Sequence, residues 1–294
     1  MRQRILAPLT VLAILCGLGA FTGGCNSAPD PKAALSEVMA ELVSSLPPGL
    51  DADAALASLD RAIAALPDSA VYYSNRATVY RDAKKDYSRA LADYDKAIEL
   101  APGLSQLYVN RGTLRQLTGD TALARADYSK AIALNPENAL AFLRLGDLDQ
   151  AGHEDDRSIA DYTAAIALEP RAEAFCGRGT VYLRAERYDL AIKDLSEAIK
   201  LNPRDYAAYH ERGLAYLEGE TDPARALADM ERAIEADPKQ PEAHADKARI
   251  CEFLGRRSEA LQEYRTVVKL SSSAPPALVE QAGKRIAVLE EMAQ

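Results

Sequence analysis

The stretch ALADYDKAIELAP at residues 90–102 returns as ARADYSKAIALNP at residues 124–136. The two copies begin 34 residues apart, and the Ala, Asp, Tyr, Lys, Ile, Leu and Pro of the first recur at the same places in the second. Four looser copies follow, with framework residues Ser158, Tyr162, Ala165 and Pro170; Ala191, Leu195, Ala198 and Pro203; Ala226, Met230, Ala233 and Pro238; and Ala260, Tyr264 and Val267. Self-similarity at one period predicts a chain of stacked supersecondary units.

A second sequence pattern precedes each copy. It consists of an aromatic residue followed by a small residue, with a basic residue directly before the small one in all copies but the third. It reads Tyr73…Arg76-Ala77, Tyr108…Arg111-Gly112, Phe142…Gly146, Phe175…Arg178-Gly179, Tyr209…Arg212-Gly213 and His244…Lys247-Ala248. Each unit therefore contains two apolar-periodic helices joined by a short turn, and the Pro after the second helix ends it. Gly costs about 1 kcal/mol inside a helix. Its recurrence predicts a close approach between helices, against Ala124, Ala191 and Ala226.

The pattern resembles the tetratricopeptide repeat family over residues 68–272, as six repeats. A degenerate copy precedes them in residues 33–67, and residues 273–294 are predicted to form a capping helix. The resemblance implies an all-α fold, a right-handed α-solenoid superhelix of helix-turn-helix repeats with terminal capping helices. We expect fourteen to sixteen helices and essentially no strand.

Charged residues recur with the same period. An Arg lies one place before the small residue at Arg76, Arg111, Arg178 and Arg212, and an Asp lies just before the framework residue of the second helix at Asp93, Asp127, Asp161, Asp194 and Asp229. We interpret these as repeated Arg–Asp pairs between helices; ligand binding is the alternative. The third repeat has Leu145 in place of the Arg, so one pair should be missing there.

Residues 1–24 are predicted to be a lipoprotein-type signal peptide rather than part of the fold. Arg2 and Arg4 precede an apolar run over residues 5–21, which is short for a membrane span of about 20 residues. Small residues before Cys25 resemble a bacterial lipobox, which implies lipidation of Cys25 and a tether over residues 25–32. The expected location is the bacterial cell envelope, on the outer membrane facing the periplasm, and the membrane is contacted through the lipid anchor only. A plain secretory peptide, giving a periplasmic or secreted protein, is the alternative.

The composition argues against several functions. A net charge of −9 leaves no excess of cations for nucleic acid. There is no phosphate-binding loop, Cys-x-x-Cys or His pair on one helix, so we predict no cofactor and no metal. His153 lies among three acidic residues in a turn, which is interpreted as solvated rather than as an ion site. His244 takes the aromatic framework place and should be packed there.

Cys176 and His210 occupy equivalent places on neighbouring first helices, and Glu211 follows His210. A hydrolase with a nucleophile, base and orienting carboxylate can be built on them. No oxyanion loop or further catalytic motif accompanies them, so no enzyme is predicted.

Members of the tetratricopeptide repeat family hold proteins or extended peptide segments on their concave face. The resemblance places a peptide groove on the first helices, with candidate residues Asn75, Thr78, Asn110, Thr113, Arg144, Asp147, Arg184, His210 and Arg249. Asn110 and Arg144 match two places of the family's clamp for a terminal carboxylate. Its Lys places hold Ser74 and Leu140 here, and another Asn place holds Thr78, which disfavours that ligand. Towards the C-terminus, that half should prefer basic or polar extended segments, because acidic residues are expected to line the same side: Glu173, Glu211, Glu218, Glu242 and Glu252.

The predicted function is a non-catalytic interaction scaffold anchored in the envelope. An assembly factor resembling the pilotin lipoproteins, which help secretins insert, and an adaptor for periplasmic enzymes are both compatible with the sequence. The partner and the oligomeric state stay open.

Overall fold

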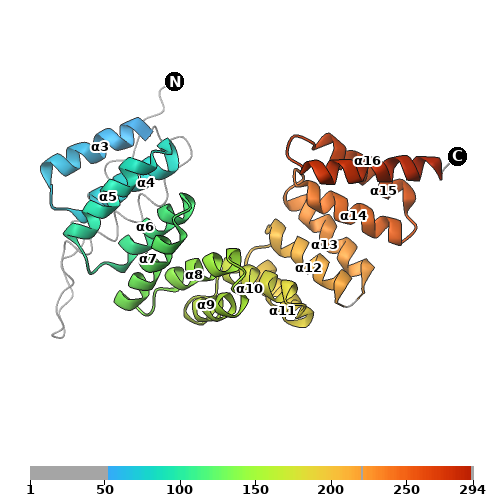
Figure 1. Ribbon diagram of the computed structural model, residues 1–294, viewed down its shortest axis with the longest axis horizontal. Coiled ribbons are helices and arrows are strands. Elements are labelled where there is room, and N and C mark those ends of the chain that lie inside the picture. Colours follow the sequence, from blue (N-terminus) through green and yellow to red (C-terminus); the bar gives the residue numbers. More distant parts are fainter. Residues whose placement is uncertain (1–51, 220, 293–294) are drawn as a thin grey trace, which may run out of the picture. The chain divides into compact units, whose positions relative to one another are not determined.

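The computed structural model describes residues 52–219 and 221–292, and this part of the chain is helical with no strand. Fourteen α-helices follow one another, joined by short turns (Figure 1). The first helices of the repeats are α4 (Ala70–Val79), α6 (Ser105–Leu117), α8 (Ala139–Ala151), α10 (Ala172–Arg184), α12 (Tyr206–Glu218) and α14 (Pro241–Phe253). The second helices are α5 (Tyr87–Leu100), α7 (Thr121–Leu134), α9 (Asp155–Leu168), α11 (Tyr188–Leu201), α13 (Pro223–Ala236) and α15 (Arg257–Lys269). Single helices precede and follow them, α3 (Ala52–Ala65) and α16 (Pro276–Glu291).

Each helix packs mainly on the helices before and after it in the sequence, as in a solenoid. Short polar side chains begin several of the helices. Asn138 accepts a hydrogen bond from the amide of Ala141, and Asp205 accepts one from the amide of Ala208. Such caps satisfy amides that have no partner within the helix. The predicted all-α solenoid is confirmed.

The framework residues form the core. Ala90, Tyr94 and Ala97 of α5 are completely buried, and the matching residues of α7 and α11 are buried as well. The close approach predicted at Gly112 is present, but its neighbour is Tyr128 rather than Ala124. A Cβ atom on Gly112 would lie 2.7 Å from the Tyr128 ring. Leu195 and Met230 take the same place against Gly179 and Gly213, because the larger side chain four residues beyond the Ala reaches across between the helices.

The predicted Arg–Asp pairs are confirmed in four repeats. In each, the guanidinium of the first helix donates two hydrogen bonds to the carboxylate of the second; Arg111, for example, lies 3.0 and 2.6 Å from the oxygens of Asp127. The other pairs are Arg76–Asp93, Arg178–Asp194 and Arg212–Asp229. The sixth repeat replaces this pair with Lys247 and Glu263, 3.0 Å apart. The pairs therefore join the helices within each repeat.

The third repeat lacks the pair, as predicted from Leu145. Asp161 instead lies within hydrogen-bonding reach of a second carboxyl group, that of Asp149 on α8. The Asp149 side chain is only 1% exposed and is paired with Arg125 from the preceding repeat. The third repeat thus contains a carboxyl pair where its neighbours have an ion pair.

Helix α4 continues into a π-helical turn, η1 (Tyr80–Lys84), which ends at Lys85 in a left-handed conformation with φ of 54°. Ala77 and Gly112 are 35 residues apart, one more than the period, and the wider turn accommodates the extra residue. The turn brings Arg81 within 3.2 Å of the Tyr94 hydroxyl. It therefore adds a guanidinium to the surface formed by the first helices.

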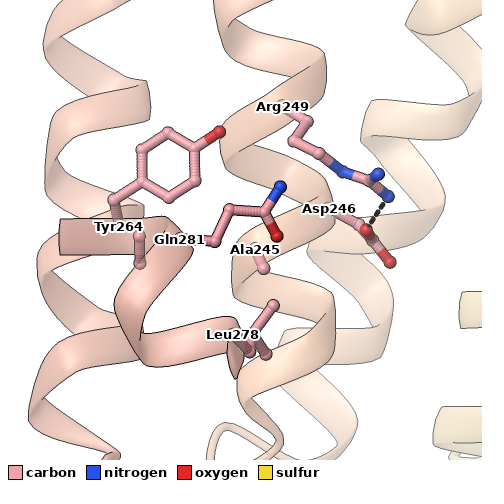
Figure 2. A pocket seen from close by; sticks show the side chains of 7 residues that line it. Ala245, Asp246, Arg249, Tyr264, Leu278 and Gln281 are labelled. Carbon is pink, nitrogen blue, oxygen red and sulfur yellow. Dashed lines mark hydrogen bonds and ion pairs between the residues drawn. The ribbon is translucent and has the colours of Figure 1, made fainter. Parts of the chain in front are cut away.

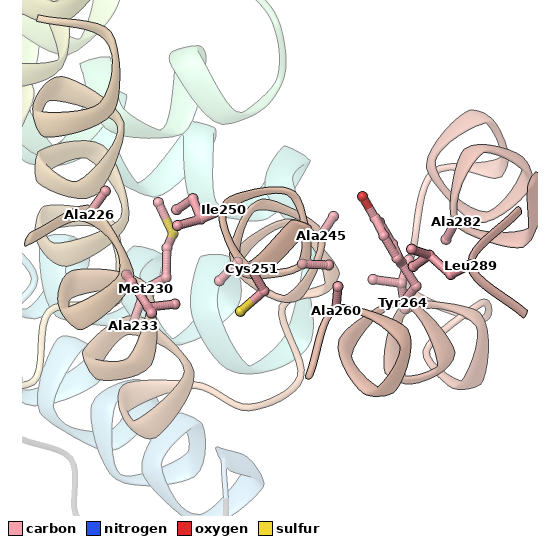
Figure 3. Close-up of a cluster of buried hydrophobic side chains, with 14 residues drawn as sticks. Ala226, Met230, Ala233, Ala245, Ile250, Cys251, Ala260, Tyr264, Ala282 and Leu289 are labelled. Carbon is pink, nitrogen blue, oxygen red and sulfur yellow. The ribbon is translucent and has the colours of Figure 1, made fainter. Parts of the chain in front are cut away.

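The C-terminal helix α16 covers the last repeat. Ala282 and Leu289 of α16 are buried beside Tyr264 of α15, in a cluster that continues through Ala245 to Met230 of α13 (Figure 3). His244 is also buried and is packed as predicted. Its Nε2 lies 3.2 Å from the Pro238 carbonyl, the counterpart of the contact between the Tyr108 hydroxyl and the Pro102 carbonyl.

Some predictions lie outside the described residues. These are the signal peptide (1–24), Cys25 with its tether (25–32), and the first part of the degenerate repeat. No helix within residues 52–219 and 221–292 combines the length and the apolar character that crossing a bilayer requires. The boundaries given for the segments of the chain stay predictions.

Candidate functional site: the first-helix surface

The candidate groove residues lie on one surface, which we call the first-helix surface. Successive first helices lie side by side along this surface, and in two of these contacts the fifth side chain of one helix meets the sixth side chain of the next. Asn110 of α6 donates to Ser74 of α4 over 3.4 Å, and Asp246 of α14 lies 2.8 Å from His210 of α12. We call each such contact, with the side chain that the intervening second helix inserts, a joint. These two joints repeat one geometry with different chemistry.

Tyrosine hydroxyl groups organise the first three joints. The rings of Tyr94, Tyr128 and Tyr162 are completely buried, and their hydroxyls emerge among the first-helix side chains. Tyr128 donates to Gln116 at 2.7 Å. Tyr162 contacts Gln150 at 2.7 Å and Asp147 at 2.9 Å. Burial raises the pKa of all three hydroxyls, so they stay protonated and can donate. The predicted site residues in these joints are therefore held in a fixed network.

The predicted site residues of the first two joints differ in their burial and in their hydrogen bonds. Thr78 shares a hydrogen bond with Tyr94 at 3.0 Å, and Thr113 donates to the Val109 carbonyl at 2.9 Å. Asn110 also accepts from Gln106 at 2.9 Å. Asn75 is only 6% exposed, and its Nδ2 atom has no hydrogen-bond partner among the described residues. Asn110 is the more accessible of the two asparagines.

The predicted cationic residues all have acidic partners. Arg144 pairs with Asp147 at 2.9 Å, and the Arg144 side chain keeps 38% of its surface exposed. Arg249 pairs with Asp246. Arg184 pairs with Asp155 of the preceding repeat, so it bridges two repeats instead of standing free. These guanidinium groups are positioned before any partner binds.

The fifth joint combines aromatic and acidic groups. The rings of Tyr206 and His210 are stacked with centroids 5.6 Å apart and an interplanar angle of 11°. Burial raises the pKa of Tyr206, and the nearby carboxylates of Glu242, Asp246 and Glu211 raise it further. Burial also raises the pKa of Glu211; His210 opposes this, while Asp246 and Glu218 add to it. The carboxylates of α12 and α14 therefore lie close enough to interact.

The arrangement around Cys176 does not activate a nucleophile. Burial, with Asp205 and Glu211 nearby, raises the pKa of the thiol to about 12, whereas a reactive cysteine needs a lowered pKa. The thiol has Thr180 as a neighbour, and His210 Nε2 is bonded to Asp246. No hydrogen bond joins the Cys176 thiol to His210 among the described residues, as a nucleophile–base pair would require. Among the described residues there is also no group of three His, Cys, Asp or Glu side chains suited to a metal ion.

Family models of the tetratricopeptide repeat match residues 50–105, 105–138, 172–205 and 217–271. The chain belongs to the tetratricopeptide repeat family. Human serine/threonine-protein phosphatase 5 is 41% identical over 100 residues, which are 34% of this chain and 20% of that protein. The Hsp70-Hsp90 organizing protein 3 of Arabidopsis thaliana is 33% identical over 92 residues, 31% of this chain and 16% of that protein. The chain thus spans a fifth or less of these relatives, and the matched part of the phosphatase is its repeat region.

Solved structures of tetratricopeptide repeat proteins share the fold. One from Parabacteroides merdae superimposes with a TM-score of 0.59 and 20% identity, covering 87% of this chain and 98% of its own. YrrB, described as having an unusual peptide-binding site, gives a TM-score of 0.53 and 23% identity over 65% of this chain and 97% of its own. At these identities the likeness concerns the fold alone.

Sequence reasoning missed the twelfth residue of the first helices. Arg81, Gln116, Gln150 and Glu252 take this place, and each interacts with the tyrosine hydroxyl of its own repeat. A hydrogen-bonding residue recurs here wherever the second helix carries Tyr, and apolar Leu183 and Leu217 replace it where the second helix carries Leu195 or Met230. The correlation between the twelfth residue of the first helix and the framework residue of the second helix is visible in the sequence and could have identified this place.

The carboxyl pair of the third repeat predicts that the stability of the protein depends on pH. Burial and the neighbouring Asp149 raise the pKa of Asp161 from 3.8 to about 6, against the opposing effect of Arg125. Because the folded state holds this proton more tightly than the unfolded chain, the contribution to stability is present below pH 3.8 and is lost as the pH rises through 6. Asp161→Asn should therefore be more stable than the wild type at about pH 7.5, by a margin that shrinks towards about pH 4.5. Urea unfolding across this range measures the margin.

Leu145→Arg supplies the guanidinium that the other repeats have at this place. It should remove the pH-dependent margin between the wild type and Asp161→Asn. A margin between the wild type and Asp161→Asn that does not change with pH would contradict the raised pKa of Asp161.

Proposed function

We propose that this protein is a non-catalytic scaffold that binds extended segments of partner proteins on its first-helix surface. The observation that carries the proposal is the first-helix surface itself, on which hydrogen bonds and ion pairs hold different side chains in place from one repeat to the next. Side chains already held by Tyr162, Asp147 or Gln116 lose little conformational entropy on binding. Such a surface suits the recognition of an extended segment, which contacts several joints in turn.

The comparisons support binding of proteins or peptides as the general role. The matched relatives include an Hsp70-Hsp90 organizing protein, and YrrB is a repeat protein with a peptide-binding site. The particular partners of these two proteins are not assigned to this chain. A terminal carboxylate is not the ligand proposed here, because Ser74 and Leu140 offer no ammonium group and Arg144 already has Asp147 as a partner. The high pKa of Cys176 supports the non-catalytic part of the proposal.

The experiment is affinity capture of partners from detergent-solubilised membranes, with the wild type and Asn110→Ala/Arg144→Ala. The two residues lie on neighbouring first helices, so one segment can contact both, and their removal should lower partner recovery about tenfold or more. Lys96→Ala/Glu99→Ala removes an exposed ion pair from the second helix α5 and serves as the matched control. Both variants should keep the helical circular dichroism signal.

The Cys176→Ser variant distinguishes the scaffold hypothesis from the hydrolase hypothesis. A scaffold should tolerate this change, because a thiol on the surface loses almost no volume. An enzyme would lose its activity in Cys176→Ser and keep its partners in the Asn110/Arg144 variant. That combination would overturn the scaffold proposal.

We further propose that Cys25 is lipidated and that the scaffold is attached to the bacterial envelope, at the outer membrane. The support is the sequence alone: an apolar run over residues 5–21, small residues before Cys25 and a Pro-containing tether. Within this proposal, a pilotin-like assembly factor and an adaptor for periplasmic enzymes are the two candidate roles. The identity of the captured partner distinguishes them.

Metabolic labelling with a clickable fatty acid tests the anchor. The wild type should carry the label and enter the membrane fraction, and Cys25→Ser should do neither. Equal labelling of the two proteins would exclude Cys25 as the site.

A further inference from the structure

The C-terminal helix α16 follows α14 as the next first helix would, and the contact between them, which we count as the last joint, contains a cavity of 130 Å³ (Figure 2). Ala245, Leu278 and Ala282 supply hydrocarbon to its lining, together with the ring of Tyr264. The polar residues that line it are Asp246, Arg249 and Gln281. Asp246 and Arg249 are paired with each other, so the cavity is bounded by a closed ion pair on one side and by hydrocarbon on the other.

The cavity follows from the residue at the fifth place of α14. That place holds Val109, Leu143, Cys176 and His210 in the four preceding joints, and Ala245 here. Ser74 is also small, but Asn110 approaches it from the next helix. Ala245, Ala282 and Tyr264 are buried, at 5%, 1% and 3% exposure, so the packing around them is fixed. A small residue at a place that is otherwise filled therefore leaves room for a side chain.

Charges of both signs lie around the cavity: Arg285 pairs with Glu252 near Tyr264, and further carboxylates lie towards α12. Asp246 lines the cavity and also belongs to the carboxylate group of Glu211 and Glu242 around Tyr206. Within residues 52–219 and 221–292, no Lys or Arg forms an ion pair with Glu211 or Glu242, whereas Asp246 has Arg249. Glu211 and Glu242 do not line the cavity themselves, but they act on Tyr206 together with Asp246, which does, and they are not paired with Lys or Arg in the described part of the chain.

We propose that the cavity receives one aliphatic side chain of a partner's extended segment, and that Lys or Arg residues next to it in that segment bind Glu211 and Glu242. This inference rests on the proposed scaffold function and names the chemistry of the partner. Apolar contact in the cavity would supply affinity, and the opposite charges would orient the segment.

A phage-displayed random peptide library, selected on the full-length wild-type chain in detergent, supplies the probes. Enriched peptides should carry Leu, Ile, Val or Met within two residues of Lys or Arg. The best one is then synthesised, and its Kd is measured by fluorescence anisotropy for the wild type and the variants.

Ala245→Leu fills the cavity and should weaken binding about tenfold or more. Ala126→Leu adds the same group at a solvent-facing place on α7 and should leave the Kd unchanged. Glu211→Gln/Glu242→Gln should weaken binding severalfold and reduce its dependence on salt. Leu278→Ala enlarges the cavity without overpacking, and the library selected on it should shift towards Phe.

Three results would overturn the inference. Peptides that lack the aliphatic–basic pattern, or that bind Ala245→Leu as tightly as the wild type, would refute the inference. If the binding of these peptides still depends on Asn110 and Arg144, the scaffold function would stand. Dissociation of a wild-type dimer by Ala245→Leu, seen by sedimentation, would make a second copy of this chain the occupant. Failure to enrich any peptide would count against the scaffold function itself.

Discussion

Asp127→Asn is expected to lower the free energy of unfolding by about 3–5 kcal/mol, because it removes one member of a buried ion pair. The Asp127 carboxylate is only 4% exposed and accepts hydrogen bonds from both Arg111 and Arg115. Without the charge, Arg115 loses its acidic partner and Arg111 keeps only the exposed Asp95. Urea unfolding followed by circular dichroism measures the loss, and the third repeat, which lacks this pair, should be unaffected locally.

Asp95→Asn is the matched control. Asp95 pairs with the same Arg111 at 2.7 Å, but its side chain is 52% exposed, so the change should cost no more than about 1 kcal/mol. Similar losses of unfolding free energy in the two variants would mean that burial does not determine how much these ion pairs contribute to stability.

Gly177→Ala is the second large effect we expect. A Cβ atom at residue 177 would lie 2.4 Å from Cζ of Tyr162 and 2.6 Å from its hydroxyl oxygen. The ring cannot move away cheaply, because it is completely buried and its hydroxyl is bonded to Asp147 and Gln150. Overpacking of this kind costs about 1–3 kcal/mol. The melting temperature should fall.

Gly283→Ala makes the same change in α16, where no atom lies within 4 Å of the new Cβ. It should raise stability by about 0.5–1 kcal/mol, since Ala is the better helix former. The two substitutions should therefore have opposite signs. In a Tyr162→Leu background, which copies the Leu195 of the next repeat, the cost of Gly177→Ala should largely disappear. A cost that persists there would show that the ring is not its cause.

The site was only partly predictable for a definite reason. Each within-repeat contact, such as Arg111 with Asp127, recurs at one spacing in several copies, so the pattern names both partners. Some contacts between repeats do not recur in this way. Arg184 with Asp155 and Arg125 with Asp149 each occur at one place among the described residues. No period in the sequence connects these residues.

Sequence patterns were sufficient to specify the helices, their pairing within each repeat and the surface on which the candidate residues lie. These features depend on local periodicity, on small residues at fixed places and on charges that recur every repeat. The folded arrangement was needed to show that Arg184 is used as a bridge, that Asp161 lies beside the carboxyl group of Asp149, and that Ala245 leaves a cavity. Each of these depends on the shapes and charges that two or three neighbouring helices bring together, and such a combination is specified by packing rather than by any one helix.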